Sequence, residues 1–515
     1  MVDRLSSLTL DWRRLALPAV LLLAAVLAVM LHRPGHLLGD DFALYLRQAR
    51  SIFDGDTGAV IADNRFSVLN SDPLFSPVGY PWGWPLLLSP FVYLWGFDYD
   101  RLKLVEVALM LVWLTFVHGI VRRRIGALPA LAVVTVLGTA PILLGHTEQL
   151  LSEFPFLAAS GLFLWMLDRT LDRGRLIDAS IRDLVVLGVI AAAVFNIRRE
   201  GIVLPLVIAS IQAAELWKVG GDPALARVRA DWARIVAPHL AFFGAVVTFQ
   251  LLLPTTLFPE NGNSPGNLDD RWKEFPLILS DQLGLGETMW VGLVVLALAA
   301  VGIVVGLRTR PRLDLPILVL AVLSALTIGT HVRRVDRYWF QVTPWVLYFA
   351  VAACVAAGVW LWRGRRSVGR WLGVAPVAVL LIAHAVTLPT EIDDVRQFAA
   401  DGRTLSGPSN PDSVPLYDAV NEMTPPDAVI AFYRARTMTL LTDRRSFQSN
   451  HLDKVSLGAD YFAQRRRDSG WQPDVDEMAT SGFVEIWSDD TWILWRIPDP
   501  DDGATAESDV PMEET

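Results

Sequence analysis

Apolar runs alternate with short polar segments along the chain from Leu15 onward. Many of these runs have the roughly 17–25 residues that an α-helix needs to cross the hydrocarbon core of a bilayer. The pattern therefore predicts a polytopic α-helical membrane protein. We expect about eleven spans, at residues 15–31, 102–121, 129–144, 150–167, 184–197, 202–217, 235–253, 289–307, 315–330, 338–360 and 371–388.

The pattern changes after residue 388, where polar and apolar residues are mixed. Short alternating runs bounded by turn residues are typical of strands in a small α/β domain. We predict a helix at 417–423, a buried strand at 429–433, and a hairpin of 483–487 with 492–497. The predicted domains are a transmembrane catalytic domain at 1–389 with its first external loop at 32–100, an extracytoplasmic α/β domain at 390–498, and an acidic disordered tail at 499–515.

Composition supports the membrane interpretation. The 515 residues are 53% hydrophobic with a mean hydropathy of +0.38, which excludes an ordinary soluble protein. The lone cysteine, Cys354, excludes a disulfide framework and a cysteine-based metal cluster. Much of the net charge of −9 comes from the C-terminal region, and the basic residues are spread over short loops, so no nucleic-acid partner is implied.

The arginine pattern predicts the orientation in the plasma membrane. The short Arg-rich loops all fall on the side of the N-terminus, which the positive-inside rule makes cytoplasmic. These loops are 122–124, 169–182, 227–234, 308–312 and 363–370. The loop that follows the first span, the loop 254–287 and everything after residue 389 are then extracytoplasmic.

Carboxylates stand at the predicted outer face. Asp40 and Asp41 directly follow the first span, and neighbouring side chains on a helix diverge by about 100°. One acid is therefore expected to cap the helix at 42–53 while the other faces a site. Glu153 begins another span, where an ionisable group is costly unless it is functional or paired with an external arginine. In the functional case it is expected to be a second catalytic acid that orients the acceptor or a metal.

Two arginine clusters also lie at the predicted outer face, where the positive-inside rule does not place them. They are Arg198 and Arg199 in one turn, and Arg333, Arg334 and Arg337 in another. They either reach toward lipid headgroups or converge on an anionic group. Guanidinium groups bind phosphate bidentately, and a carboxylate can take the proton of an incoming hydroxyl. These residue types fit group transfer from a lipid-anchored phosphate donor.

Several segments together resemble one known family. They are Gly39–Asp40–Asp41 with Tyr45, Ala49 and Gly55, the segment 79–90 (GYPWGWPLLLSP), Ser152–Glu153, the segment 196–201 (NIRREG), Arg337–Tyr338, and 424–445 in the C-terminal domain. Their order relative to the spans resembles the polytopic GT-C glycosyltransferases, the class of the protein O-mannosyltransferases and bacterial aminoarabinose transferases. The resemblance implies a sugar donor on a polyprenyl phosphate, a cell-envelope acceptor and catalysis at the outer face.

The resemblance also implies roles for single residues. Asp40 is the expected catalytic base, although the family has Asp-Glu where this chain has Asp-Asp, so Asp41 stays open. Tyr80, Trp82, Trp84 and Tyr338 are expected to line a lipid or sugar groove, and anchoring of the aromatic rings at the membrane interface is the alternative. No cofactor is certain, and a divalent metal near His146 and His331 is left open.

Other functions compete with this interpretation. A transporter would place ionisable residues near the bilayer midplane and repeat its two halves, and no repeat is evident. A non-catalytic scaffold would use the Trp-rich hairpin 487–495 to bind a cell-envelope partner, although alternating tryptophans in strands usually pack a core. Transfer of a phospho-group would use the same arginines.

Overall fold

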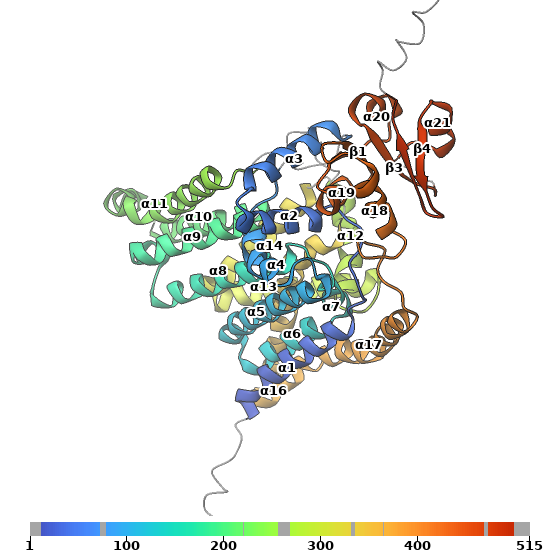
Figure 1. Ribbon diagram of the computed structural model, residues 1–515. Helices are drawn as coiled ribbons and strands as arrows, with labels where there is room; N and C mark the ends of the chain where they lie inside the picture. Colours follow the sequence, from blue (N-terminus) through green and yellow to red (C-terminus); the bar gives the residue numbers. More distant parts are fainter. Residues whose placement is uncertain are drawn as a thin grey trace, which may run out of the picture. The chain divides into compact units, whose positions relative to one another are not determined.

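The computed structural model is built mostly of helices, with one small sheet near the C-terminus (Figure 1). It describes residues 12–72, 79–219, 221–255, 268–330, 335–363, 365–467 and 472–498. The predicted tail 499–515 lies outside these residues. Two compact units form. The first is drawn from Met1–His32, Arg101–Leu252 and Ser264–Asp401, and the second from Arg33–Asp100, Leu253–Asn263 and Gly402–Thr515.

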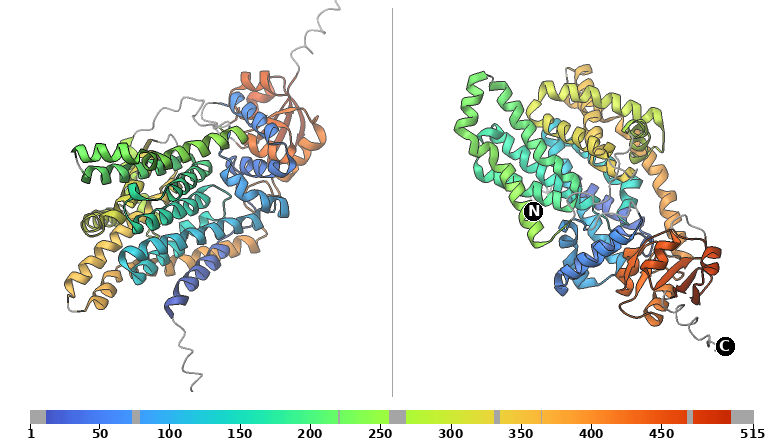
Figure 2. Two further views of the ribbon diagram at one scale, coloured as in Figure 1. Left: turned by 90° about the vertical axis from the view of Figure 1, so that its left-hand side faces the viewer. Right: turned by 90° about the horizontal axis from the view of Figure 1, so that it is seen from above.

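The first unit is helical, and each predicted apolar span contains a helix. Several helices run alongside one another, including α9 with α11 and α13 with α15 (Figure 2). The helices are α1 (Trp12–Met30), α5 (Tyr99–Ile125), α6 (Ala127–Thr139), α7 (Pro141–His146), α8 (Glu153–Arg173), α9 (Ile181–Ile197), α10 (Val203–Val219), α11 (Gly221–Leu252), α12 (Leu268–Gln282), α13 (Met289–Thr309), α14 (Pro311–Thr330), α15 (Thr343–Leu361), α16 (Arg366–Val374) and α17 (Val377–Ala400), with short 3₁₀ turns at Leu176–Asp178, Arg199–Ile202 and Asp336–Gln341.

Among the described residues, six helices are long and apolar enough to cross a membrane, or seven if the bent pair at 367–374 and 377–400 is one span. The six are Tyr99–Ile125, Arg199–Val219, Ala226–Leu252, Met289–Thr309, Pro311–Thr330 and Thr343–Leu361. Leu15–Met30 and Ala127–Thr139 are shorter apolar helices. The chain is a multi-pass membrane protein, and the predicted count of eleven spans is not confirmed.

Glycines let the long helices approach closely. A Cβ atom at Gly302 would overlap the carbonyl oxygen of Phe349, where α13 meets α15. A Cβ atom at Gly188 would overlap the carbonyl oxygen of Pro238, where α9 meets α11. Small residues at such crossings are typical of membrane helices, whose association depends on close van der Waals packing.

A buried ionic network joins four helices of this unit. Arg124 of α5 binds both carboxylate oxygens of Asp168 of α8, at 2.5 and 2.8 Å. Its Nε lies 3.2 Å from Oδ1 of Asp314 in α14, which also accepts the hydroxyl of Tyr348 in α15 at 2.6 Å. Because a buried charge without a partner is costly, these pairs fix how the four helices are arranged.

The second unit contains a five-stranded mixed sheet in the order β2-β1-β3-β5-β4. Strand β1 pairs in parallel with both β2 and β3. Strands β4 and β5 form an antiparallel hairpin, and β5 also pairs antiparallel with β3. The predicted strand and hairpin are confirmed. The strands are β1 (Val429–Ala431), β2 (Arg445–Phe447), β3 (Tyr461–Arg465), β4 (Val484–Ser488) and β5 (Trp492–Arg496), and the accompanying helices are α18 (Val414–Met423), α19 (Ala435–Thr442), α20 (Leu452–Gly458) and α21 (Val475–Thr480).

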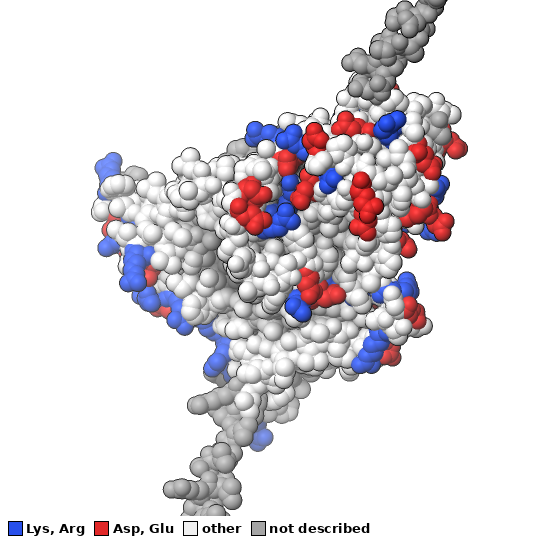
Figure 3. Space-filling model, in the orientation of Figure 1, with Lys and Arg blue, Asp and Glu red and all other residues white. Residues whose placement is uncertain are grey.

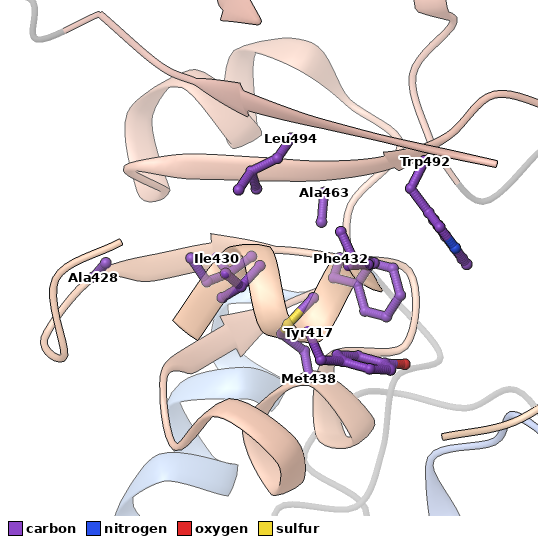
Figure 4. Packing of buried hydrophobic residues seen from close by; sticks show 10 residues of the cluster. Tyr417, Ala428, Ile430, Phe432, Met438, Ala463, Trp492 and Leu494 are labelled. Carbon is purple, nitrogen blue, oxygen red and sulfur yellow. The ribbon is translucent and has the colours of Figure 1, made fainter. Parts of the chain in front are cut away.

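Both faces of this sheet are buried, because successive side chains of a strand point to opposite faces. Trp492 and Leu494 of β5 pack on one face with residues of α18 and α19, as Figure 4 shows for Tyr417 and Met438. The alternate residues of β5 pack on the other face, with α20 and α21. Trp492 and Trp495 are only 2% and 5% exposed and belong to the core, while Trp487 is partly buried against it.

The segment 33–100, predicted from sequence to be the first external loop, belongs to the same unit as the sheet. It folds into α2 (Asp41–Asp54), α3 (Thr57–Asn70) and α4 (Gly83–Trp95). At the end of α3, the carboxylate of Asp72 accepts hydrogen bonds from the Ser449 hydroxyl and from the Asn450 N–H, at 2.9 and 2.7 Å. Phe66 of α3 packs against the sheet core. This grouping differs from the sequence-based division, which placed loop 32–100 with the transmembrane helices.

Charge on the viewed face differs between the two units. Acidic and basic side chains are dense over the sheet domain and α3, while much of the viewed surface of the helical unit carries no charged residue (Figure 3). Apolar side chains such as Leu251 and Trp290 are largely exposed on the helical unit, at 79% and 77%. A lipid-facing surface has this composition, since hydrocarbon offers no partner for a charge.

Candidate active site

The acid pair lies where α2 begins. Asp40 holds the N-cap position and Asp41 is the first helical residue. The helix forms because its apolar residues recur on one buried face, and Gly55 ends it with a φ of 77°. The Asp40 side chain makes no capping bond to α2. The expectation that one acid caps this helix is therefore wrong for Asp40, whose carboxylate is used elsewhere.

Asp40 instead contacts the first turn of α19. Its Oδ1 accepts the backbone N–H of Arg436 at 3.2 Å. The hydroxyl of Thr437 donates to the carbonyl of Gly39 at 2.5 Å and holds the same loop. The Oδ2 atom of Asp40 lies 3.8 Å from Nη1 of Arg434, which is close enough for an ion pair but too far for a hydrogen bond.

The environment of Asp40 affects its protonation. Its side chain is only 10% exposed, and burial raises the pKa of the carboxyl above its ordinary value. The positive charge of Arg434, and then that of Arg436, opposes this rise. A buried carboxylate with a raised pKa and a nearby cation has the properties of a general base.

Asp41 belongs to a second part of the same cluster. Its Oδ1 accepts the Tyr80 hydroxyl at 2.6 Å. The Tyr80 hydroxyl oxygen in turn accepts a hydrogen bond from Nη1 of Arg436 at 3.1 Å. The Arg436 guanidinium also lies over the Tyr80 ring, 4.8 Å from its centre. Nε of Arg436 donates to Oδ1 of Asn64 at 2.8 Å. Burial, followed by the charge of Asp41, raises the pKa of Tyr80 well above its ordinary value, so the phenol stays a donor.

We call these six residues the acid-pair cluster: Asp40, Asp41, Asn64, Tyr80, Arg434 and Arg436. The sequence singled out three of them and missed Asn64 and the two arginines. The pattern Arg-Ala-Arg at 434–436, at the start of a short helix, is the one sequence signal for the two arginines. That signal is weak because arginines before a helix are usually exposed.

A second cluster lies in the helical unit around Glu153, the first residue of α8. Nη1 of Arg198 and Nε of Arg337 both lie 2.8 Å from its Oε1. Nε2 of His146 lies 3.8 Å from Oε2, and neither of these two atoms makes a hydrogen bond within the described part of the chain. Arg198 also binds Glu200 at 2.7 Å. Pairing with arginine, the alternative raised for Glu153, is thus what the structure shows.

The remaining predicted basic and aromatic residues divide between this cluster and its surroundings. The Tyr338 ring faces the guanidinium groups of Arg198 and Arg337, at 5.1 and 5.8 Å, and joins the Glu153 cluster. Arg199 lies over the Phe195 ring at 4.5 Å and donates to the Phe195 carbonyl. Arg333, Arg334 and His331 lie outside the described residues.

The predicted groove tryptophans are buried instead. Trp82 and Trp84 are 0% exposed, and Nε1 of Trp82 donates to the carbonyl of Pro254 at 3.1 Å. Complete burial contradicts both an open groove lined by these rings and anchoring at the membrane interface. The physical reason is that α4 packs against α2, which covers the aromatic start of α4. The Tyr80 hydroxyl, by contrast, connects Asp41 to Arg436 in the acid-pair cluster.

The described side chains give no support to a divalent metal site. Among them, no group of three or more His, Cys, Asp or Glu residues is arranged to hold a metal ion. The acid-pair cluster offers two carboxylates, but arginine and tyrosine occupy their neighbourhood. These residues do not fit a divalent site, which prefers several oxygen ligands.

Comparisons with solved structures identify the fold. ArnT from Cupriavidus metallidurans, bound to undecaprenyl phosphate, matches with a TM-score of 0.55 and 14% identity over 96% of this chain and 99% of that chain. The oligosaccharyltransferase of Archaeoglobus fulgidus, tethered to an acceptor peptide, matches with a TM-score of 0.52 and 12% identity over 89% and 70%. The archaeal oligosaccharyltransferase AglB from Archaeoglobus fulgidus, in complex with an inhibitory peptide and a dolichol-phosphate, matches with a TM-score of 0.53 and 11% identity over 88% of this chain and 69% of that chain.

No protein-family model and no curated protein sequence matches the chain. Because the sequence identities to these solved structures are only 11–14%, the structural matches establish the fold and nothing more. The chain has the GT-C fold of these membrane glycosyltransferases, as the sequence resemblance indicated. Its sequence motifs had suggested the same class.

Proposed function

We propose that this protein is a membrane glycosyltransferase. It moves a sugar from a polyprenyl-phosphate donor to an acceptor of the cell envelope, and Asp40 is the catalytic base. One observation carries the proposal: a buried carboxylate with a raised pKa stands beside an arginine in a protein with the GT-C fold. A base of this kind is what an incoming hydroxyl requires.

The donor class is supported by what the similar structures contain. ArnT of Cupriavidus metallidurans is bound to undecaprenyl phosphate, and AglB of Archaeoglobus fulgidus is in complex with a dolichol-phosphate. Both ligands are long isoprenoid chains that end in a phosphate. A chain with the same fold and many lipid-exposed apolar helices suits a donor of that class.

The proposed step is a single displacement. The oxygen of an acceptor hydroxyl attacks the anomeric carbon of the sugar, and the bond from that carbon to the phosphate oxygen breaks. The electron pair of the broken bond stays on the polyprenyl phosphate, and the hydroxyl proton passes to the Asp40 carboxylate. Displacement from one side inverts the configuration and requires only one base. The leaving phosphate needs positive charge rather than an acid.

The Glu153 cluster is proposed to supply that positive charge. Arg198 and Arg337 share one carboxylate oxygen of Glu153. Arg198 also pairs with Glu200, and Arg199 adds a third guanidinium group in the same turn. In this proposal Glu153 orients Arg198 and Arg337, whose guanidinium planes Tyr338 covers, and Arg199 is a further candidate for the donor phosphate. Arg333 and Arg334, which lie outside the described residues, stay candidates from the sequence alone.

The orientation is proposed from the arginine pattern. The N-terminus is cytoplasmic, and the unit that carries the acid-pair cluster is extracytoplasmic. Transfer at that face requires a donor whose sugar is already displayed outside the cell membrane. The sugar is a hexose or a pentose, and the acceptor is a glycan, a lipid or a protein of the envelope.

Sugar transfer in purified membranes tests the function. Radiolabelled polyprenyl-phosphate sugars are supplied to membranes that contain the wild type, Asp40→Asn or Asp41→Asn. Transfer that is lost in Asp40→Asn and retained in Asp41→Asn would establish the reaction and the base together. Loss in Asp41→Asn alone would move the base by one residue. Absence of transfer by folded wild type from every donor would favour the scaffold or transporter alternatives.

A further inference from the structure

The C-terminal domain contributes directly to the surroundings of the acid pair. Arg434 stands immediately before α19, and its Nη1 lies 3.8 Å from Oδ2 of Asp40. The two residues are 394 positions apart in the sequence (434 − 40), yet both belong to the same compact unit. The Arg434 side chain is 40% exposed, while the Asp40 side chain is 10% exposed. The arginine is thus reachable by solvent and the acid is nearly enclosed.

Three contacts hold this arrangement. Besides the ion pair, the backbone N–H of Arg436 donates to Oδ1 of Asp40, and the Thr437 hydroxyl donates to the carbonyl of Gly39. All three come from the start of α19, so the loop before α2 is fixed from the C-terminal domain. The Arg434 Nε is buried and has no hydrogen-bond partner within the described residues. Its guanidinium lies 5.5 Å from the centre of the Tyr433 ring.

We propose that Arg434 is a positioning residue of the transfer reaction, which keeps the Asp40 carboxylate ionised and directed from the C-terminal domain. The inference rests on the proposed function, in which Asp40 takes the acceptor proton. It assigns the C-terminal domain a part in the chemistry itself. Arg434 differs from the arginines proposed for the donor phosphate, because its described ionic contact is to the base.

The charged and titratable groups around Asp40 decide the direction of the effect. They come from α2, α18, and the loop and first turn of α19, and they are Asp41, Tyr417, Tyr433, Arg434 and Arg436. Burial raises the pKa of Asp40, and the charge of Arg434 lowers this pKa more than any other neighbouring group does. Without this cation the pKa of Asp40 rises further. A larger share of the enzyme is then protonated at the base and inactive at a given acidic pH.

The test is the pH profile of kcat/KM for Arg434→Gln, Arg434→Lys and the wild type. The expected result is that the acid limb of Arg434→Gln moves to higher pH, and that Arg434→Lys restores most of the wild-type limb because it keeps the charge. At the pH where wild type retains half of its maximal rate, the Gln variant is expected to lose transfer several-fold. Donor KM at the alkaline plateau is expected to change little.

Arg50→Gln is the matched control. Arg50 is 41% exposed, belongs to the same unit and pairs with Asp54 and Asp443 rather than with Asp40. The same loss of charge there is expected to leave the acid limb in place. A limb that moves equally in both variants would show a general effect of charge and would overturn the proposal.

Two further outcomes would also overturn it. An unshifted acid limb with a raised donor KM would show that Arg434 binds the donor instead. An equal loss of rate at every pH in the Gln and Lys variants, together with a lower Tm, would show a structural role only. These outcomes all require active wild type, so they are distinct from a failure of the proposed function, in which wild type transfers nothing.

Discussion

The acid-pair cluster and the Glu153 cluster both combine buried carboxylates with arginines, but they use them in opposite ways. In the Glu153 cluster, two guanidinium groups bind one carboxylate oxygen at 2.8 Å. In the acid-pair cluster, Asp40 accepts one backbone N–H, and its nearest guanidinium nitrogen stays 3.8 Å away. Oε1 of Glu153 is thus bound by two cations. Asp40 is held through its Oδ1, whereas its Oδ2 has no ionic contact shorter than 3.8 Å among the described residues.

The difference separates two functions of a buried acid. A carboxylate that is tightly bound by two cations is a poor base, because protonation would break both ion pairs. A carboxylate whose burial raises its pKa gains more from accepting a proton. The comparison therefore favours Asp40 for proton transfer and Glu153 for holding arginines, and the following variants test that separation.

The largest expected effect is on transfer by Asp40→Asn. Removing a general base is expected to lower kcat by about 10²–10⁴-fold, measured as label transferred from the lipid donor. Thermal stability is expected to change little, because burial disfavours the charged form of Asp40 and the neutral amide of asparagine avoids that cost. Asp54→Asn at the other end of α2, where the side chain is 51% exposed, is the control with full activity. A normal rate in Asp40→Asn would remove Asp40 as the base.

The second effect is on stability, at Glu153. Glu153→Gln leaves the partly buried guanidinium groups of Arg198 and Arg337 without their shared carboxylate and is expected to cost about 2 kcal/mol. The measurement is the midpoint of thermal unfolding in detergent. Asp393→Asn in α17 removes an ion pair whose side chains are 75% and 65% exposed, and is expected to cost less than about 0.5 kcal/mol. A Glu153→Gln variant as stable as wild type would show that the pairing is not structural.

The third effect is the pH dependence of the wild type. Because the base must be ionised, kcat/KM is expected to fall as pH falls through the pKa of Asp40. Burial raises this pKa, so the acid limb is expected above the range of an ordinary aspartate. The direction is the opposite for folding: because the pKa of Asp40 is raised in the folded state, its ionised form opposes folding above that pKa, and protonation removes this penalty as pH falls. An acid limb at or below the ordinary range would contradict the assignment.

The smallest effect is expected at Tyr80. Tyr80→Phe removes the donor to Asp41 and the acceptor for Arg436, and is expected to cost about 1–2 kcal/mol of stability. Transfer is expected to fall by less than in Asp40→Asn, because the phenol orients a neighbour of the base. Tyr93→Phe on α4, where the ring is 70% exposed, is the control. A loss of transfer equal to that of Asp40→Asn would contradict a merely orienting role for the Tyr80 hydroxyl.

Local pattern predicted much of the fold. The helix expected at 42–53 is α2 at Asp41–Asp54, and the expected hairpin is β4 with β5. These elements follow from the spacing of apolar residues and from turn residues, which act over a few positions. Pattern also placed apolar helices along the whole of the first unit, although it did not fix how many of them cross the membrane.

Parts of the site required the tertiary structure. Pairing of Glu153 with arginine was raised from sequence, since an acid at the mouth of a span needs a partner. Sequence did not show that Arg198 and Arg337 both supply it. The burial of Trp82 and Trp84 depends on how α4 packs against α2, and no local pattern contains that information.

The sequence by itself determined that this is a helical membrane protein with a mixed C-terminal domain and two acids after the first apolar helix. Only the tertiary structure decided what those acids contact. Asp40 accepts the N–H of a residue 396 positions away, and the segment 33–100 forms one unit with the C-terminal sheet. The physical reason is that hydrophobic periodicity fixes which face of an element is buried, whereas the partner of a polar side chain depends on which distant segments pack together.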